Sequence, residues 1–158
     1  MTILGTLLGG WTASSMAARG ARRQRLRQLY CFLSFAVGAG FLWSSIAQQA
    51  PLASAALAAV STFAVSSYQA HWWACVTELS GKHLGALFGL LNGLGAFGAM
   101  ASLYLFGRFS DWRKDLGYLG RDQYDPALYV YVGVLALAAL CWLGIDTSRP
   151  IAHDDNMH

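Results

Sequence analysis

The stretch that decides the fold is HWWACVTELSGKHLGALFGLLNGLGAFGAMASLYLFGRFSD, residues 71–111. It joins the end of one apolar segment to a polar turn, TELSGKH, and then to a long apolar segment that contains many glycines. Gly85, Gly89 and Gly93 recur every fourth residue, which places them on one stripe of a helix with about 3.6 residues per turn. In water each glycine would weaken a helix by about 1 kcal/mol relative to alanine. In lipid, small residues let neighbouring helices approach closely, so these glycines predict a membrane-embedded helix with a packing stripe.

The overall composition indicates the same class of protein. The chain of 158 residues is 56% hydrophobic and only 12% charged, whereas a soluble domain has about 25% charged residues. Residues 28–77 contain no Asp, Glu, Lys or Arg. A run of that length accommodates two bilayer crossings of about 20 residues each. The sequence therefore predicts an all-α membrane protein with several transmembrane helices.

The apolar segments and the loops between them predict a topology. We expect one transmembrane bundle over residues 1–147 and a polar tail at 148–158. Residues 19–27 include five arginines, and the positive-inside rule places such a loop in the cytoplasm. Alternation through the later segments then places the tail in the cytoplasm, and the expected location is the cell (inner) membrane. The expected crossings are at about 2–18, 29–47, 52–76, 84–107 and 127–145.

Other classes of protein are disfavoured by the distribution of charge and of reactive side chains. The net charge of +3 does not indicate nucleic-acid binding, because the basic residues lie between apolar segments. Cys31, Cys75 and Cys141 lie in separate segments without a CxxC spacing, so we interpret them as unpaired small apolar residues and expect no metal site. The sequence has no HExxH, no GxSxG and no acid pair inside an apolar segment. We expect neither an enzyme nor a cofactor.

Residues 72–98, WWACVTELSGKHLGALFGLLNGLGAFG, resemble the junction of the tenth and eleventh helices in the major facilitator superfamily. The pattern is most similar to the anion:cation symporter branch, which includes hexuronate, galactonate and phthalate carriers. Gly10, Arg22 and Arg23 are similar to that family's cytoplasmic loop motif after its eighth helix. Ser14 stands where the motif has aspartate, which removes the charge that the motif uses in gating. The resemblance implies helices eight to twelve of a secondary carrier, with an N-terminal transporter half supplied elsewhere.

Asn92 and Trp72 are the leading candidates for contact with a substrate. The Asn92 amide lies inside an apolar segment, where polar groups are costly and often functional. It could bind a hydroxyl or carboxylate, or it could form an interhelical hydrogen bond. The Trp72 indole could stack on a sugar ring, or it could belong to an interfacial aromatic belt. Tyr68 and Gln69 lie one turn earlier on the same face, and the resemblance implies that Asn92 and Trp72 line a cavity for a small organic anion.

Three more residues could take part in proton coupling or gating. His71 could carry a proton, since the pKa of histidine is easily moved, or it could be a hydrogen-bonded structural group. Glu78 and Lys82 are four residues apart, and the first expectation for them is a local ion pair. A gating contact with another half of the protein is the alternative. No lysine or arginine is expected in the middle of a crossing, so the cation that pairs with an anionic substrate would come from the N-terminal half.

Two functions remain open from the sequence. The first is the C-terminal part of an alternating-access carrier for a small organic anion such as a sugar acid. The second is a small membrane protein without transport activity, either a remnant of a carrier or an accessory subunit.

Overall fold

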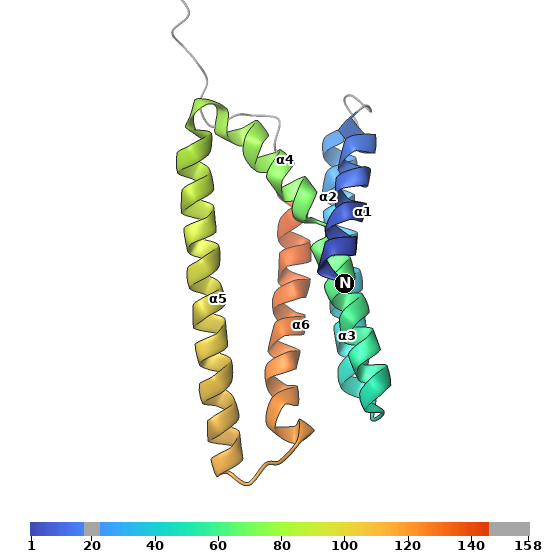
Figure 1. Cartoon of the computed structure of the whole chain (residues 1–158), viewed down its shortest axis with the longest axis vertical. Coiled ribbons are helices and arrows are strands. Elements are labelled where there is room, and N and C mark those ends of the chain that lie inside the picture. Colours follow the sequence, from blue (N-terminus) through green and yellow to red (C-terminus); the bar gives the residue numbers. More distant parts are fainter. Residues whose placement is uncertain (18–22, 146–158) are drawn as a thin grey trace, which may run out of the picture.

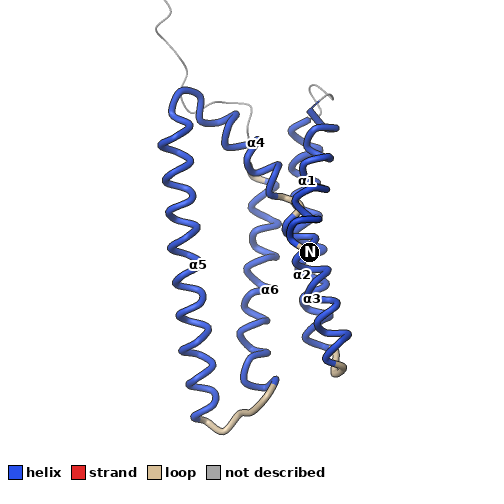
Figure 2. Tube along the Cα trace, in the orientation of Figure 1, coloured by secondary structure: helices blue, strands red, loops and turns tan. Residues whose placement is uncertain are grey.

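The computed structural model describes residues 1–17 and 23–145, and every regular element in these ranges is helical. The expected polar tail at 148–158, Arg19 and Arg22 lie outside the described residues. Figures 1 and 2 show the arrangement. The helices are α1 (Thr2–Ala17), α2 (Arg23–Ala47), α3 (Pro51–Ser66), α4 (Gln69–Ser80), the short 3₁₀ helix η2 (Gly81–His83), α5 (Leu84–Asp115) and α6 (Arg121–Leu143).

Three helical stretches in the described ranges are long and apolar enough to cross a membrane. They are Arg23–Ala47, the nearly continuous run Pro51–Asp115, and Arg121–Leu143. The described part of α1 has 16 residues, and it is not among these three stretches. The all-helical class is therefore confirmed, whereas five separate crossings are not.

Helix α2 is the centre of the packed part of the molecule. It lies between α3 and α6, and α1 lies against α3 and α4. The small core combines Cys31 and Phe35 of α2 with Cys75 of α4 and with Ala139 and Trp142 of α6. Helix α5 makes few contacts and stands apart beside α6 (Figure 1). The chain thus consists of a packed group, α1–α4 with α6, and one long helix at its side.

The antiparallel pair α2–α3 is joined by hydroxyl groups along its length. The Ser34 and Ser67 hydroxyls lie 3.0 Å apart, just past the end of α3. Ser61 Oγ donates to the Gly38 carbonyl at 2.7 Å. At the turn between the helices, Ser45 Oγ donates to the Ser54 carbonyl at 2.8 Å. Small residues and hydroxyls of this kind let two apolar helices approach closely and bind each other.

The closest backbone packing in the described structure is on α1 rather than on α5. A Cβ atom added to Gly5 would collide with the Phe63 carbonyl oxygen, and one added to Gly9 would collide with the Ser67 carbonyl oxygen. These glycines are four residues apart, the GxxxG spacing of closely packed helices. The glycine stripe predicted from the sequence lies on α5 and does not include this pair.

The segment expected as one helix over 52–76 is interrupted. Ser67 N and Tyr68 N donate to carbonyls three residues earlier, as in a 3₁₀ turn, at 3.3 Å each. Ser66 and Ser67 both turn their hydroxyls back onto the carbonyls of the preceding turn. Such hydrogen bonds compete with the helical ladder, and helices often bend at serine or glycine pairs. The bend lets α4 lean from the packed group towards the start of α5 (Figure 1).

The loop expected between 107 and 127 is much shorter in the structure. Helix α5 continues to Asp115, and α6 begins at Arg121. Gly117 and Gly120 have φ angles of 87° and 64°, a backbone region that glycine adopts without strain. Pro126 lies inside α6 and cannot donate a hydrogen bond to the Asp122 carbonyl, four residues earlier. Arg113 Nη2 donates to that carbonyl instead, at 2.8 Å.

Arg121 connects the start of α6 to the end of α2. Its guanidinium donates to the carbonyls of Ser45 at 3.2 Å and Ile46 at 2.9 Å, and also to that of Gln48. The last carbonyls of a helix lack helical partners and carry a partial negative charge. The Arg121 guanidinium therefore supplies hydrogen-bond donors to the carbonyl groups at the C-terminal end of α2.

We expect Arg121→Ala to lower the free energy of unfolding by about 1–2 kcal/mol, because hydrogen bonds from a charged donor contribute at least that much. Arg108→Ala is the matched control, since Arg108 is exposed on α5 and makes no ion pair or hydrogen bond within the described ranges. Denaturant titration of both variants in mild detergent, followed by circular dichroism, measures the difference. Equal stability of the two variants would contradict the capping role of Arg121.

Candidate functional site

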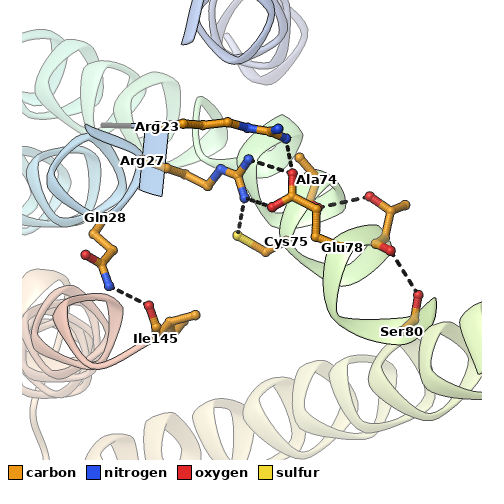
Figure 3. Close-up of polar contacts among 9 residues, drawn as sticks. Arg23, Arg27, Gln28, Ala74, Cys75, Glu78, Ser80 and Ile145 are labelled. Atoms are coloured by element: carbon orange, nitrogen blue, oxygen red, sulfur yellow. Dashed lines mark hydrogen bonds and ion pairs between the residues drawn. The ribbon is translucent and has the colours of Figure 1, made fainter. Parts of the chain in front are cut away.

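A partly buried ionic cluster joins α2 to α4 (Figure 3). Arg27 is only 4% exposed and donates to both carboxylate oxygens of Glu78, at 2.7 Å to Oε2 and 3.0 Å to Oε1. Arg27 also donates to Cys75 Sγ at 3.3 Å. Arg23, one turn earlier on α2, forms a second ion pair with Glu78. Two guanidinium groups therefore share one carboxylate.

The sequence placed these residues elsewhere. Arg23 and Arg27 were expected in the loop before a helix starting at residue 29, and Glu78 was expected to pair with Lys82. In the structure Arg23 and Arg27 lie in α2 and pair with Glu78 on α4, and Lys82 lies in the exposed turn η2. One sequence signal could have identified the pair: Arg27 and Glu78 are the charges on either side of the uncharged run 28–77. An uncharged run that crosses the membrane twice brings its two ends to the same side of the membrane.

His71 is the most buried of the predicted site residues, with 1% of its surface exposed. Its Nε2 lies 3.1 Å from Thr12 Oγ1 on α1. The Tyr30 ring of α2 lies 4.5 Å from the imidazole, centroid to centroid. His71 therefore joins three helices, which is the arrangement expected of a hydrogen-bonded structural histidine.

Tyr68 and Trp72 were predicted to face a substrate. In the structure both residues pack against the core of the chain. The Tyr68 ring lies 4.7 Å from Phe35 and 6.3 Å from Trp142, measured between ring centroids. Trp72 is half-buried against the same core. Gln69 is half-buried at the first residue of α4. The structure thus brings Tyr68 and Trp72 to one apolar cluster.

Asn92 and the glycine stripe lie on α5, apart from that cluster. Asn92 is exposed and has no hydrogen-bond partner in the part of the chain that the structure describes. A Cβ atom added to Gly85, Gly89 or Gly93 would meet no atom within 4 Å in that part. The stripe is therefore free to contact another helix, and its packing role stays a prediction. The nearby link between α4 and α5 is the stacking of Trp73 on Phe88, with centroids 4.1 Å apart.

A cavity of about 390 Å³ lies between α5 and α6. Its wall is apolar except for two hydroxyls, those of Ser102 and Tyr131, which are hydrogen-bonded to each other. No group of three or more His, Cys, Asp or Glu side chains with a metal-binding arrangement occurs among residues 1–17 and 23–145. The lining residues are Ser102, Leu105, Phe106, Phe109, Ala127, Val130, Tyr131 and Val134.

Comparison of the chain with family models, with curated proteins and with solved structures gives no match. The site must therefore be interpreted from its own chemistry. That chemistry consists of an ion-paired end of α2 and α4, an aromatic core, an exposed amide on a lone apolar helix and an apolar cavity.

Proposed function

We propose that this chain is part of a membrane carrier for a small organic anion and forms one wall of its passage. The observation that carries the proposal is helix α5. It is a 32-residue, largely apolar helix with a single buried residue, Ser110, and its exposed residues include an amide and the glycine stripe. A helix of this kind gains stability by packing against other helices. A separate N-terminal set of transporter helices would supply that packing.

The distribution of charge in the chain favours a partner that supplies further transporter helices. Asn92 can donate to and accept from a hydroxyl or carboxylate, but it cannot neutralise an anion. The buried cation Arg27 is already paired with Glu78. An anion in a low-dielectric passage needs a countercharge, because its burial alone costs several kcal/mol. The partner helices are therefore the proposed source of that cation, and alternating access would move them relative to α5.

The alternative is a small membrane protein without transport activity. The packing of Tyr68 and Trp72 into the chain's own core favours this alternative, since those rings then stabilise the fold and do not face a substrate. The two functions differ in one measurable property, the dependence of solute uptake on this chain.

We expect cells lacking the chain to take up a hexuronate or galactonate at least about tenfold more slowly, and wild-type complementation to restore the rate. Asn92→Ala is expected to raise the KM for uptake by about tenfold, the effect of losing about 1.4 kcal/mol of binding. Leu94→Ala is the matched control, because Leu94 is also exposed on α5. Radiolabelled uptake with equal membrane levels of each variant makes the comparison. Unchanged uptake without the chain would support the non-transporting alternative, and unchanged KM in Asn92→Ala would remove that residue from the site.

A further inference from the structure

The cavity between α5 and α6 has a wall that suits a hydrocarbon chain. Its two hydroxyls are bonded to each other, so they offer little to a polar ligand. The other lining side chains are aliphatic or aromatic. Both walls belong to stretches that are long and apolar enough to cross a membrane. The volume of about 390 Å³ lies in the range of small-molecule sites, about 300–1,000 Å³.

The size of the cavity argues against a helix of another chain as its occupant. A helix with side chains is about 10–12 Å across. Three turns of such a helix fill on the order of 1,000 Å³, so a helix could cover the cavity of about 390 Å³ but could not enter it. A flexible aliphatic chain is narrower and fits a cavity of this size.

An arginine without a carboxylate partner among the described residues lies about one helical turn beyond the cavity. Arg113 follows the lining residue Phe109 by four positions, so it lies on the same side of α5 at about 100° per residue. Its Nε is buried and has no hydrogen-bond partner within the described ranges. Its Nη2 donates only to the Asp122 carbonyl, and its guanidinium lies 3.5 Å from the centre of the Tyr118 ring. Its positive charge is therefore not paired with a carboxylate in the described part of the chain.

The remaining charges at this end of α5 leave Arg113 available. Asp111 and Asp115 lie on the opposite side of the helix at about 100° per residue. Beside the cavity, Gln123 donates to the Ser110 carbonyl and hydroxyl, at 3.1 and 2.6 Å, and joins α6 to α5. A cation thus lies about one helical turn beyond the hydrocarbon-lined space, near the end of two apolar helices, where lipid headgroups are found in a membrane protein.

From this arrangement we propose that the cavity binds one acyl chain of an anionic phospholipid, whose phosphate accepts hydrogen bonds from Arg113. The proposal does not depend on transport. It concerns a site on α5 and α6, away from Asn92 and from the Arg27–Glu78 cluster.

Native mass spectrometry of the full chain in detergent, titrated with dioleoyl phosphatidylglycerol or dioleoyl phosphatidylcholine, tests the proposal. Wild-type protein is expected to retain one phosphatidylglycerol in preference to phosphatidylcholine. Ala127→Trp fills the cavity and is expected to weaken phosphatidylglycerol retention by about tenfold, equivalent to about 1.4 kcal/mol. Ala136→Trp places the same side chain on an exposed position of α6 outside the lining and is expected to bind like wild type.

The variant Arg113→Gln distinguishes the contribution of the headgroup to lipid binding from that of the acyl chain. It is expected to abolish the preference for phosphatidylglycerol over phosphatidylcholine, whereas Arg108→Gln, which removes an exposed charge from the same helix, keeps that preference. Circular dichroism of each variant establishes that it is folded. Equal lipid retention in Ala127→Trp and Ala136→Trp would overturn the proposal. So would a loss of oligomers instead of lipid in Ala127→Trp, because it would assign the cavity to a second copy of the chain.

Discussion

Replacing Glu78 with leucine is expected to lower the free energy of unfolding by about 3 kcal/mol, the lower end of the range for breaking a buried ion pair. The reason is the position of Arg27, which is 4% exposed and would keep its charge without a carboxylate. Arg27→Met is expected to cost less. Glu78 would then still pair with Arg23, and its side chain is 30% exposed to solvent.

The double variant Arg27→Met/Glu78→Leu distinguishes charge pairing from packing. Replacing both members of a buried pair with apolar residues is often neutral or stabilising, so this variant should recover most of the stability lost in Glu78→Leu. Asp111→Leu is the matched control, since Asp111 is an exposed acid on α5. Unfolding by denaturant titration in mild detergent gives all four values. A Glu78→Leu variant as stable as Asp111→Leu would show that the cluster does not stabilise the fold.

The second large effect is expected at Gly9. Gly9→Ala introduces a Cβ atom that collides with the Ser67 carbonyl oxygen, which is backbone and cannot rotate away. Forcing extra atoms into a close contact typically costs about 1–3 kcal/mol, and we expect the upper part of that range. The α1–α3 contact would open, and His71 would lose the hydrogen bond that Thr12 forms with it from the next turn of α1.

Gly10 provides the control at the neighbouring position. A Cβ atom at Gly10 has no atom within 4 Å among the described residues. Gly10→Ala is therefore expected to leave stability unchanged or to raise it by up to about 1 kcal/mol, the helix propensity difference between the two residues. Thermal unfolding of both variants in the same detergent compares them directly. If the two alanine variants melt together, α1 does not pack on α3 through Gly9.

Composition and the uncharged run were sufficient to predict the helical class and the approximate positions of its segments. Helix ends were harder to predict, because tertiary partners decide them. Arg27 lies in α2 and pairs with Glu78 instead of lying in a loop, and Arg113 donates to the carbonyl that Pro126 leaves without a helical donor. The bend at Ser67 likewise depends on the Ser66 and Ser67 hydroxyls, which donate to carbonyls of the preceding turn. The sequence alone does not determine the orientation of these hydroxyls.

The sequence singled out Glu78 of the ionic cluster but did not identify Arg23 and Arg27 as its partners, and it did not predict the geometry of the site. The sequence singled out His71, Tyr68 and Trp72 as polar or aromatic residues near a helix end, and the structure places all three in internal contacts. It also singled out Asn92, which is exposed and has no hydrogen-bond partner in the described part of the chain. The GxxxG pair of α1 was missed because the more numerous glycines of residues 85–98 dominate the pattern.

We propose that the chain is a membrane-embedded bundle in which α5 crosses the bilayer between two turns on opposite sides. Single cysteines at His83 and Tyr118, in a Cys141→Ser background, test it by labelling with a membrane-impermeant thiol reagent in sealed right-side-out vesicles. The account predicts that position 118 reacts in intact vesicles and that position 83 reacts only after permeabilisation. Labelling of both positions from the same side would contradict it.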